Sequence, residues 1–146
     1  MANYQCAIRT NYFHVKDPAV FREFMARVYG SASSVELWEQ KDTCGQIVFG
    51  FGSYGGISGL RDAAEDSSET VSETAYDEFI CGLQQHIREG DAVIILETGQ
   101  EKLRYLVGSA EIVTCTGYDH LDISELACRH AAAMLDNPNW QTKLYY

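Results

Sequence analysis

The clearest candidate for ligand chemistry is a run of glycines near the middle of the chain. Gly50-Phe51-Gly52-Ser53-Tyr54-Gly55 has the Gly-x-Gly-x-x-Gly spacing of a dinucleotide-binding loop and follows a predicted strand. Such a loop needs a helix that begins at the third glycine, so that the helix N-terminus faces the pyrophosphate. Here the chain continues Gly56-Ile57-Ser58-Gly59, which does not predict a helix, and then becomes acidic. Turn and close-packing glycines are the favoured interpretation, and we expect no cofactor.

The histidines and cysteines lack the spacing of a metal site. Cys128 and His130 lie two residues apart in a predicted helix, where their side chains point in different directions. Cys81 and His86 are five apart and are also poorly aligned, so no pair has the usual local spacing of zinc ligands. The five cysteines are odd in number and scattered, which indicates free thiols in a cytoplasmic protein. We therefore expect no metal ion.

Acid–base chemistry has three candidate carboxylates, Glu97, Glu101 and Glu111, around a run of predicted strands. Glu101 lies beside Lys102 in a predicted turn, and Glu111 is expected to point outward from a strand. The hydrolase, metallopeptidase and phosphate-loop signatures are absent. The sequence thus favours a non-enzymatic protein. The alternative is a small enzyme or ligand-binding protein with a pocket beside Gly50 and Gly52, where one strand face is nearly bare of side chains.

The aromatic residues are the strongest indication of a binding function. The 146 residues include nine tyrosines and two tryptophans. Tyrosine, tryptophan and arginine are favoured at the centres of protein interfaces, but tyrosine also suits half-exposed strands, so both explanations remain open. The candidate partner-binding residues on the predicted strands and tail are Tyr12, Trp38, Arg104, Tyr105, Trp140, Tyr145 and Tyr146.

A block of like charge is the second candidate for binding. Seven acidic residues and one arginine lie between Arg61 and Glu78, mostly in an acidic loop predicted at about 53–73. Blocks of like charge are commonly solvated, so a passive loop is favoured over a surface that steers a basic partner. If the loop does bind a partner, the candidate residues are Asp62, Glu65, Asp66 and Glu69.

The overall charge disfavours two classes of binding partner. A net charge of −10, from 11 basic and 21 acidic residues, disfavours direct nucleic-acid binding and an anionic membrane surface. No apolar run approaches the roughly 20 residues of a membrane span, and the first residues lack the pattern of a signal peptide. We expect a cytoplasmic protein with a protein partner, folded as a single domain over residues 1–146.

Hydrophobic periodicity predicts the elements that position these residues. The order β-α-β-β-loop-α-β-β-β-α, with mostly short connections, predicts an α+β fold: a single, mainly antiparallel sheet of about six strands packed with three helices. The unbroken apolar run Asp91–Thr98 predicts a strand buried on both faces. Trp140–Tyr146 is expected to add an edge strand, through which a homodimer could form. The other predicted strands are 4–13, 35–40, 46–52, 103–107 and 110–115, and the predicted helices are 18–29, 74–89 and 124–136.

Several segments carry a family resemblance. The stretches Thr10–Asp17, Phe51–Gly55, Glu101–Tyr105 and Asn137–Asn139 resemble a group of small uncharacterised proteins encoded on bacterial plasmids, conjugative elements and phages. No catalytic residues are established for this group, so the resemblance assigns none to this chain. The resemblance implies a cytoplasmic accessory of a mobile element. Such accessories often disarm host defences, and an acidic surface that imitates nucleic-acid phosphates is one physical route to that.

Overall fold

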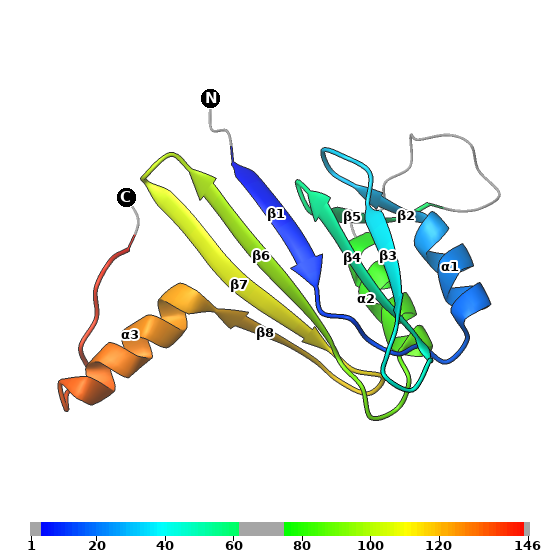
Figure 1. The fold of residues 1–146 in the computed structure, drawn as a ribbon. Helices are drawn as coiled ribbons and strands as arrows, with labels where there is room; N and C mark the ends of the chain where they lie inside the picture. Colours follow the sequence, from blue (N-terminus) through cyan, green and yellow to red (C-terminus); the bar gives the residue numbers. More distant parts are fainter. Residues whose placement is uncertain (1–3, 62–74, 145–146) are drawn as a thin grey trace.

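The computed structural model describes residues 4–61 and 75–144. Its elements follow one another in the order that Figure 1 shows. The helices are α1 (Pro18–Ala26), α2 (Ala75–His86) and α3 (Ile123–Met134). The strands are β1 (Gln5–Thr10), β2 (Val28–Gly30), β3 (Glu36–Lys41), β4 (Ile47–Tyr54), β5 (Ile57–Leu60), β6 (Val93–Glu101), β7 (Tyr105–Val113) and β8 (Tyr118–Asp122).

The strands confirm the predicted α+β fold. Six of them form one antiparallel sheet in the order β3-β4-β1-β6-β7-β8, and β2 and β5 form a second, two-stranded sheet. The N-terminal strand β1 lies in the middle of the large sheet, between β4 and β6. The sheet therefore has two halves, one built from β3, β4 and β1 and the other from β6, β7 and β8.

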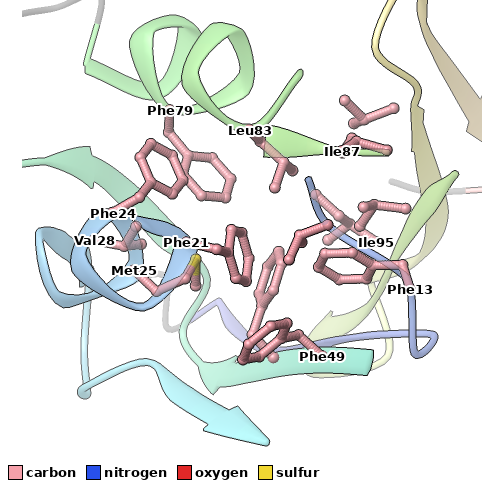
Figure 2. Close-up of a cluster of buried hydrophobic side chains, with 14 of the residues drawn as sticks. Phe13, Phe21, Phe24, Met25, Val28, Phe49, Phe79, Leu83, Ile87 and Ile95 are labelled. Atoms are coloured by element: carbon pink, nitrogen blue, oxygen red, sulfur yellow. The ribbon is translucent and has the colours of Figure 1, made fainter. Parts of the chain in front are cut away.

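The core lies on one face of the large sheet, which we call the helix-bearing face. There the buried ring of Phe21 from α1 meets that of Phe49 from β4 (Figure 2), and the ring of Phe79 from α2 meets that of Phe51, also from β4. Figure 2 also shows Leu83 of α2, and Ile87 directly after this helix, pointing toward Ile95 and Phe13. On the opposite face, which we call the back face, Ile123 at the start of α3 lies against Gly108.

Local signals explain α1. The Asp17 side chain accepts hydrogen bonds from the backbone N–H groups of Ala19 and Val20, at 3.0 and 3.3 Å, and Pro18 occupies the first turn. The predicted helix 18–29 is nevertheless too long, because the structure ends it at Ala26. Val28 instead pairs with Leu60 in the small sheet, so long-range strand pairing overrides the continued helical spacing.

The predicted central strand is not buried on both faces. Val93 and Ile95 are buried on the helix-bearing face, but Ile94 is 39% and Leu96 50% exposed on the back face. The prediction was wrong because an apolar run does not reveal which face receives helices. β6 also extends beyond the apolar run Asp91–Thr98, as far as Glu101, which was predicted to lie in a turn.

The next two predicted strands are one strand. β7 runs without a break through Gly108 and Ser109, the two residues between the predicted strands 103–107 and 110–115. A Cβ at Gly108 would lie 2.8 Å from Ile123 Cγ2, so this glycine makes room for the start of α3. The third strand of the meander is β8, which lies beyond the predicted 110–115 strand.

The structure differs in part from the predicted acidic loop at 53–73 and the predicted edge strand at 140–146. β4 continues to Tyr54 and β5 follows it, so the expected loop at 53–73 begins with strand, and residues 62–74 lie outside the described chain. Residues 140–144 form no strand, and Tyr145 and Tyr146 lie outside the described residues. Trp140 instead lines a hollow beside α3 with Cys128 and Ala132. Within the described ranges, no helix is long and apolar enough to cross a bilayer.

Candidate functional site

A cavity of about 640 Å³ opens on the helix-bearing face, over β1, β6, β7 and β8. α2 borders it through Tyr76, and the segments around Ser31 and Gly55 border it on another side. Its volume falls within the roughly 300–1,000 Å³ of small-molecule sites. The buried rings of Phe49 and Phe51 cover β4 on the helix-bearing face, and the cavity lies beside that part of the core.

Strand register brings two carboxylates into this cavity. Glu97 of β6 faces Ser109 of β7, and Glu111 of β7 faces Ile95 of β6. Side chains alternate along a strand, so Glu97 and Glu111 share the face of buried Ile95 and are diagonal neighbours. Glu111 therefore does not point outward, as the sequence had indicated; its side chain is only 19% exposed. On β8, His120 and Asp122 add two further polar side chains to the lining.

Three tyrosines hold the two glutamates in place. The Tyr4 hydroxyl donates to Glu97 Oε2 at 2.7 Å, and the Tyr118 hydroxyl donates to Glu111 Oε1 at 3.0 Å. The Tyr76 hydroxyl donates to Glu111 Oε2. An ionised carboxylate has about four acceptor positions, so each glutamate keeps some for a ligand. The hydrogen bonds thus orient both carboxylates without saturating them.

The tyrosines remain neutral donors at physiological pH. Burial, together with the hydrogen bond to Glu111, raises the pKa of Tyr118 to about 12 and that of Tyr76 further. Burial and Glu97 raise the pKa of Tyr4 in the same way. A phenolate beside a carboxylate would repel it, which is why each proton is held more tightly. None of these hydroxyls is therefore prepared to act as a base near neutral pH.

The cavity is acidic. Its described lining contains the carboxylates of Glu97, Glu111 and Asp122 and the imidazole of His120, and it contains no lysine or arginine. His120 Nδ1 lies 4.0 Å from Glu111 Oε1. In the described ranges, no three histidine, cysteine or acidic side chains come close enough to share a metal ion. The arrangement suits an organic cation, which needs dispersed acceptors rather than a compact set of ligands.

The partner-binding residues predicted from the sequence are scattered over the molecule. Tyr105 lines the cavity, and Arg104 precedes it in the turn, with its guanidinium 3.9 Å from Glu101. Tyr12 and Trp38 lie against the back face, and Trp140 lies beside α3. Asp62, Glu65, Asp66, Glu69, Tyr145 and Tyr146 lie outside the described residues.

Aromatic rings lie over the glycine-bare strand face. A Cβ at Gly52 would lie 2.7 Å from Trp38 Cη2, and one at Gly50 would lie 3.4 Å from the ring of Tyr12. The two aromatic rings thus cover the space left by the missing side chains, and the Arg9 guanidinium stacks on Trp38 at 5.1 Å. The cavity of about 640 Å³ opens on the opposite, helix-bearing face of the sheet.

The sequence did hold a signal for the cavity. Glu97 and Glu111 recur in step with Val93, Ile95 and Val113 along two strands, and a carboxylate at an inward position is unusual. The predicted break at Gly108 concealed this pattern, because it left unclear that Glu111 lies on the strand that pairs with the strand of Glu97. No family model, curated protein or solved structure matches the chain.

A second polar cluster ties three loops together. His14 Nε2 lies 2.8 Å from Asp42 Oδ2, and His14 Nδ1 lies 2.9 Å from Asp91 Oδ2. Ionised carboxylates only accept hydrogen bonds, so both ring nitrogens must donate, and the imidazole is protonated. The hydrogen bonds to Asp42 and Asp91 raise the pKa of His14 above its ordinary 6.5. Both nitrogens of the His14 ring are occupied by these hydrogen bonds, so we infer that the cluster stabilises the fold and does not bind a ligand.

We expect this cluster to make stability fall as the solution becomes alkaline. A raised His14 pKa contributes stability in full below pH 6.5, and this contribution is lost as pH rises through the folded-state pKa. Hydrogen bonds from His14 lower the pKa of Asp42 and, against the opposing effect of burial, that of Asp91. Asp42 and Asp91 therefore contribute stability above pH 3.8, the ordinary pKa of an aspartate. This contribution is lost only as pH falls below 3.8 through their lowered pKa values in the folded protein. The cluster is therefore most stabilising between pH 3.8 and pH 6.5.

The measurement is the denaturant midpoint as a function of pH at constant ionic strength. His14→Gln should remove the decline on the alkaline side of pH 6.5 that the unmodified protein shows. Comparing the two proteins cancels the titration of tyrosines and cysteines, which both retain. Parallel profiles for the two proteins across this range would contradict the assignment.

Proposed function

We propose that this chain is a binding protein whose cavity takes a ligand bearing a positively charged nitrogen. The observation that carries the proposal is the described lining, which has three carboxylates, one imidazole and no lysine or arginine, together with the tyrosines Tyr4, Tyr76 and Tyr105. An ammonium or guanidinium group can donate to the open acceptor positions of Glu97 and Glu111. The cation can also lie against a tyrosine ring, which attracts positive charge through its face.

The shape of the cavity supports a ligand with spaced donors. Glu97 and Glu111 are diagonal on adjacent strands, at a separation of about 7–8 Å between such backbone positions. A diamine or a long basic side chain has donors spaced so that it can contact both carboxylates. The tilted pair of Tyr4 and Tyr105 rings, with centroids 6.2 Å apart, provides an apolar wall for the chain between the donors.

The charged nitrogen can belong to a free amine or to a basic side chain of a protein partner. The second source agrees with the protein-binding role expected from the sequence and from the resemblance to mobile-element accessories, including those that counter host defences. The proposal places the protein in the cytoplasm, and its five free cysteines support that compartment. Binding of a free polyamine compared with binding of a basic peptide separates the two sources.

The test is calorimetric titration of the full chain with spermidine and with a short lysine- and arginine-containing peptide. We expect binding that weakens as salt is added, because the contacts are between opposite charges. Glu97→Gln combined with Glu111→Gln should reduce affinity by roughly 10- to 100-fold, since a hydrogen bond to a charged group is worth about 1.5–3 kcal/mol. Preference for spermidine indicates a free amine, and preference for the peptide indicates a protein partner.

The matched control is Glu36→Gln combined with Glu125→Gln. These two side chains are exposed and lie outside the cavity, so the control has the same net charge as the cavity variant. Its affinity should equal that of the unmodified protein. The proposal fails if neither probe binds, or if the control loses as much affinity as the cavity variant, which would mark a non-specific effect of net charge.

A further inference from the structure

His120 is the one residue of the described cavity lining whose side chain can carry a positive charge. It lies on β8 directly opposite Glu111 of β7 in the strand register, so the two side chains leave the sheet on the same face as neighbours. The imidazole Nδ1 lies 4.0 Å from Glu111 Oε1, and the His120 side chain is 51% exposed. Protons from solvent therefore reach the imidazole, which lies beside a mostly buried carboxylate.

Glu111 is held in place beside this imidazole. The Tyr118 hydroxyl donates to Glu111 Oε1 at 3.0 Å, and the Tyr76 hydroxyl, from α2, donates to Oε2. Tyr118 lies two positions before His120 on β8, so the phenol and the imidazole approach the same carboxylate oxygen from the same strand. Because two elements hold the carboxylate, a charge that develops on His120 acts on Glu111 at a fixed short distance.

The other titratable groups nearest to His120 are carboxylates and tyrosines. They come from β6, β7, β8 and α2, and they are Glu97, Glu111, Asp122, Tyr118, Tyr76 and Asp77. Carboxylic acids ordinarily titrate near about pH 4 and tyrosines near about pH 10, whereas histidines titrate between about pH 5 and about pH 8. A change of charge in this part of the cavity near neutral pH therefore points to His120.

We propose that protonation of His120 controls the affinity of the cavity for its cationic ligand, so that the ligand binds near neutral pH and is released as the solution becomes acidic. An imidazolium beside Glu111 supplies the positive charge that the ligand would otherwise bring, and it repels the charged nitrogen of the ligand. The neutral imidazole removes that repulsion, and its unprotonated nitrogen can accept a hydrogen bond from the ligand. This inference rests on the proposed function, because it concerns regulation of the same cavity.

The other histidines of the chain lie elsewhere. The chain has four histidines, and the described lining contains one of them, His120. His14 is bound by its two aspartates, His86 packs in the aromatic core with its ring centroid 4.6 Å from that of Phe24, and His130 is exposed on α3. His130 therefore provides the matched control, because its replacement removes an exposed histidine without changing the cavity.

The test is calorimetric titration of the full chain with spermidine and with a histidine-free peptide of lysine and arginine, at about pH 5.5 and about pH 7.5. The affinity of the unmodified protein should be roughly two- to fivefold lower at the acidic pH, the size expected for one partly exposed charge pair. His120→Gln should lose this difference, and His130→Gln should keep it. His120→Lys carries its charge across this range, so it should bind at both pH values as weakly as the unmodified protein does in acid.

Proton release gives a second measurement of the same coupling. Binding and protonation oppose each other reciprocally, so binding near about pH 6.5 should release protons, and the measured heat should depend on the ionisation enthalpy of the buffer. His120→Gln should abolish this release, and circular dichroism shows whether each variant is folded. Affinity that does not change with pH, or a pH dependence that survives His120→Gln, would overturn this inference alone. Absence of binding by both probes at both pH values would overturn the proposed function as well.

Discussion

Phe21→Ala is expected to lower the free energy of unfolding by about 3–5 kcal/mol. Phe21 is fully buried, and its ring lies 4.9 Å from that of Phe49, 5.7 Å from that of Phe13 and 5.9 Å from that of His86, between centroids. Truncation removes the buried ring and leaves a cavity that the surrounding rings can close only in part. The effect is large because domains of this size are stable by only about 5–15 kcal/mol.

Urea or guanidinium unfolding measures this prediction. The matched control is Tyr54→Ala, which removes an aromatic ring of similar size that is 72% exposed and should change stability by about 0.5 kcal/mol or less. The thermal midpoint of Phe21→Ala should fall by roughly 6–20 °C. A change of the same size in both variants would mean that Phe21 does not lie at the centre of the core.

Asp91→Ala is expected to cost about 1–3 kcal/mol, the second largest effect that we predict. The Asp91 carboxylate accepts from the His14 backbone N–H at 2.7 Å, from His14 Nδ1 at 2.9 Å and from its own neighbour Ala92 N at 2.8 Å. Its removal leaves the half-buried imidazolium with only one carboxylate and takes the acceptor from a backbone N–H. It also releases the connection between the loop after β1 and the loop before β6.

Asp119→Ala is the matched control for this substitution. The Asp119 side chain also accepts a hydrogen bond from a following backbone N–H, that of His120 at 2.8 Å, but it lies exposed on β8. Its replacement should change the free energy of unfolding by no more than about 0.5 kcal/mol. Equal losses in the two variants would indicate a general effect of removing an aspartate, not the loss of the His14 cluster.

Features encoded within a few residues were predictable from the sequence. Asp17, Pro18 and the spacing of Phe21, Phe24 and Met25 predicted where α1 begins and which side it buries. Alternation along β1 and β4 predicted those strands, and short connections between the strands predicted an antiparallel sheet with helices. These signals are local because capping, helical spacing and strand alternation depend on neighbouring residues.

Tertiary structure alone decided which faces are covered and which side chains meet. The apolar sequence of β6 is compatible with a back face that is either buried or exposed. Ile94 and Leu96 are exposed because α1 and α2 both pack on the other face of the sheet. Glu97 and Glu111 become neighbours through the register of β6 and β7. His14, Asp42 and Asp91 are joined across 77 positions of sequence, a distance over which no local pattern carries information. The cavity and the cluster therefore arise from long-range packing, which chooses among arrangements that the local signals leave equally open.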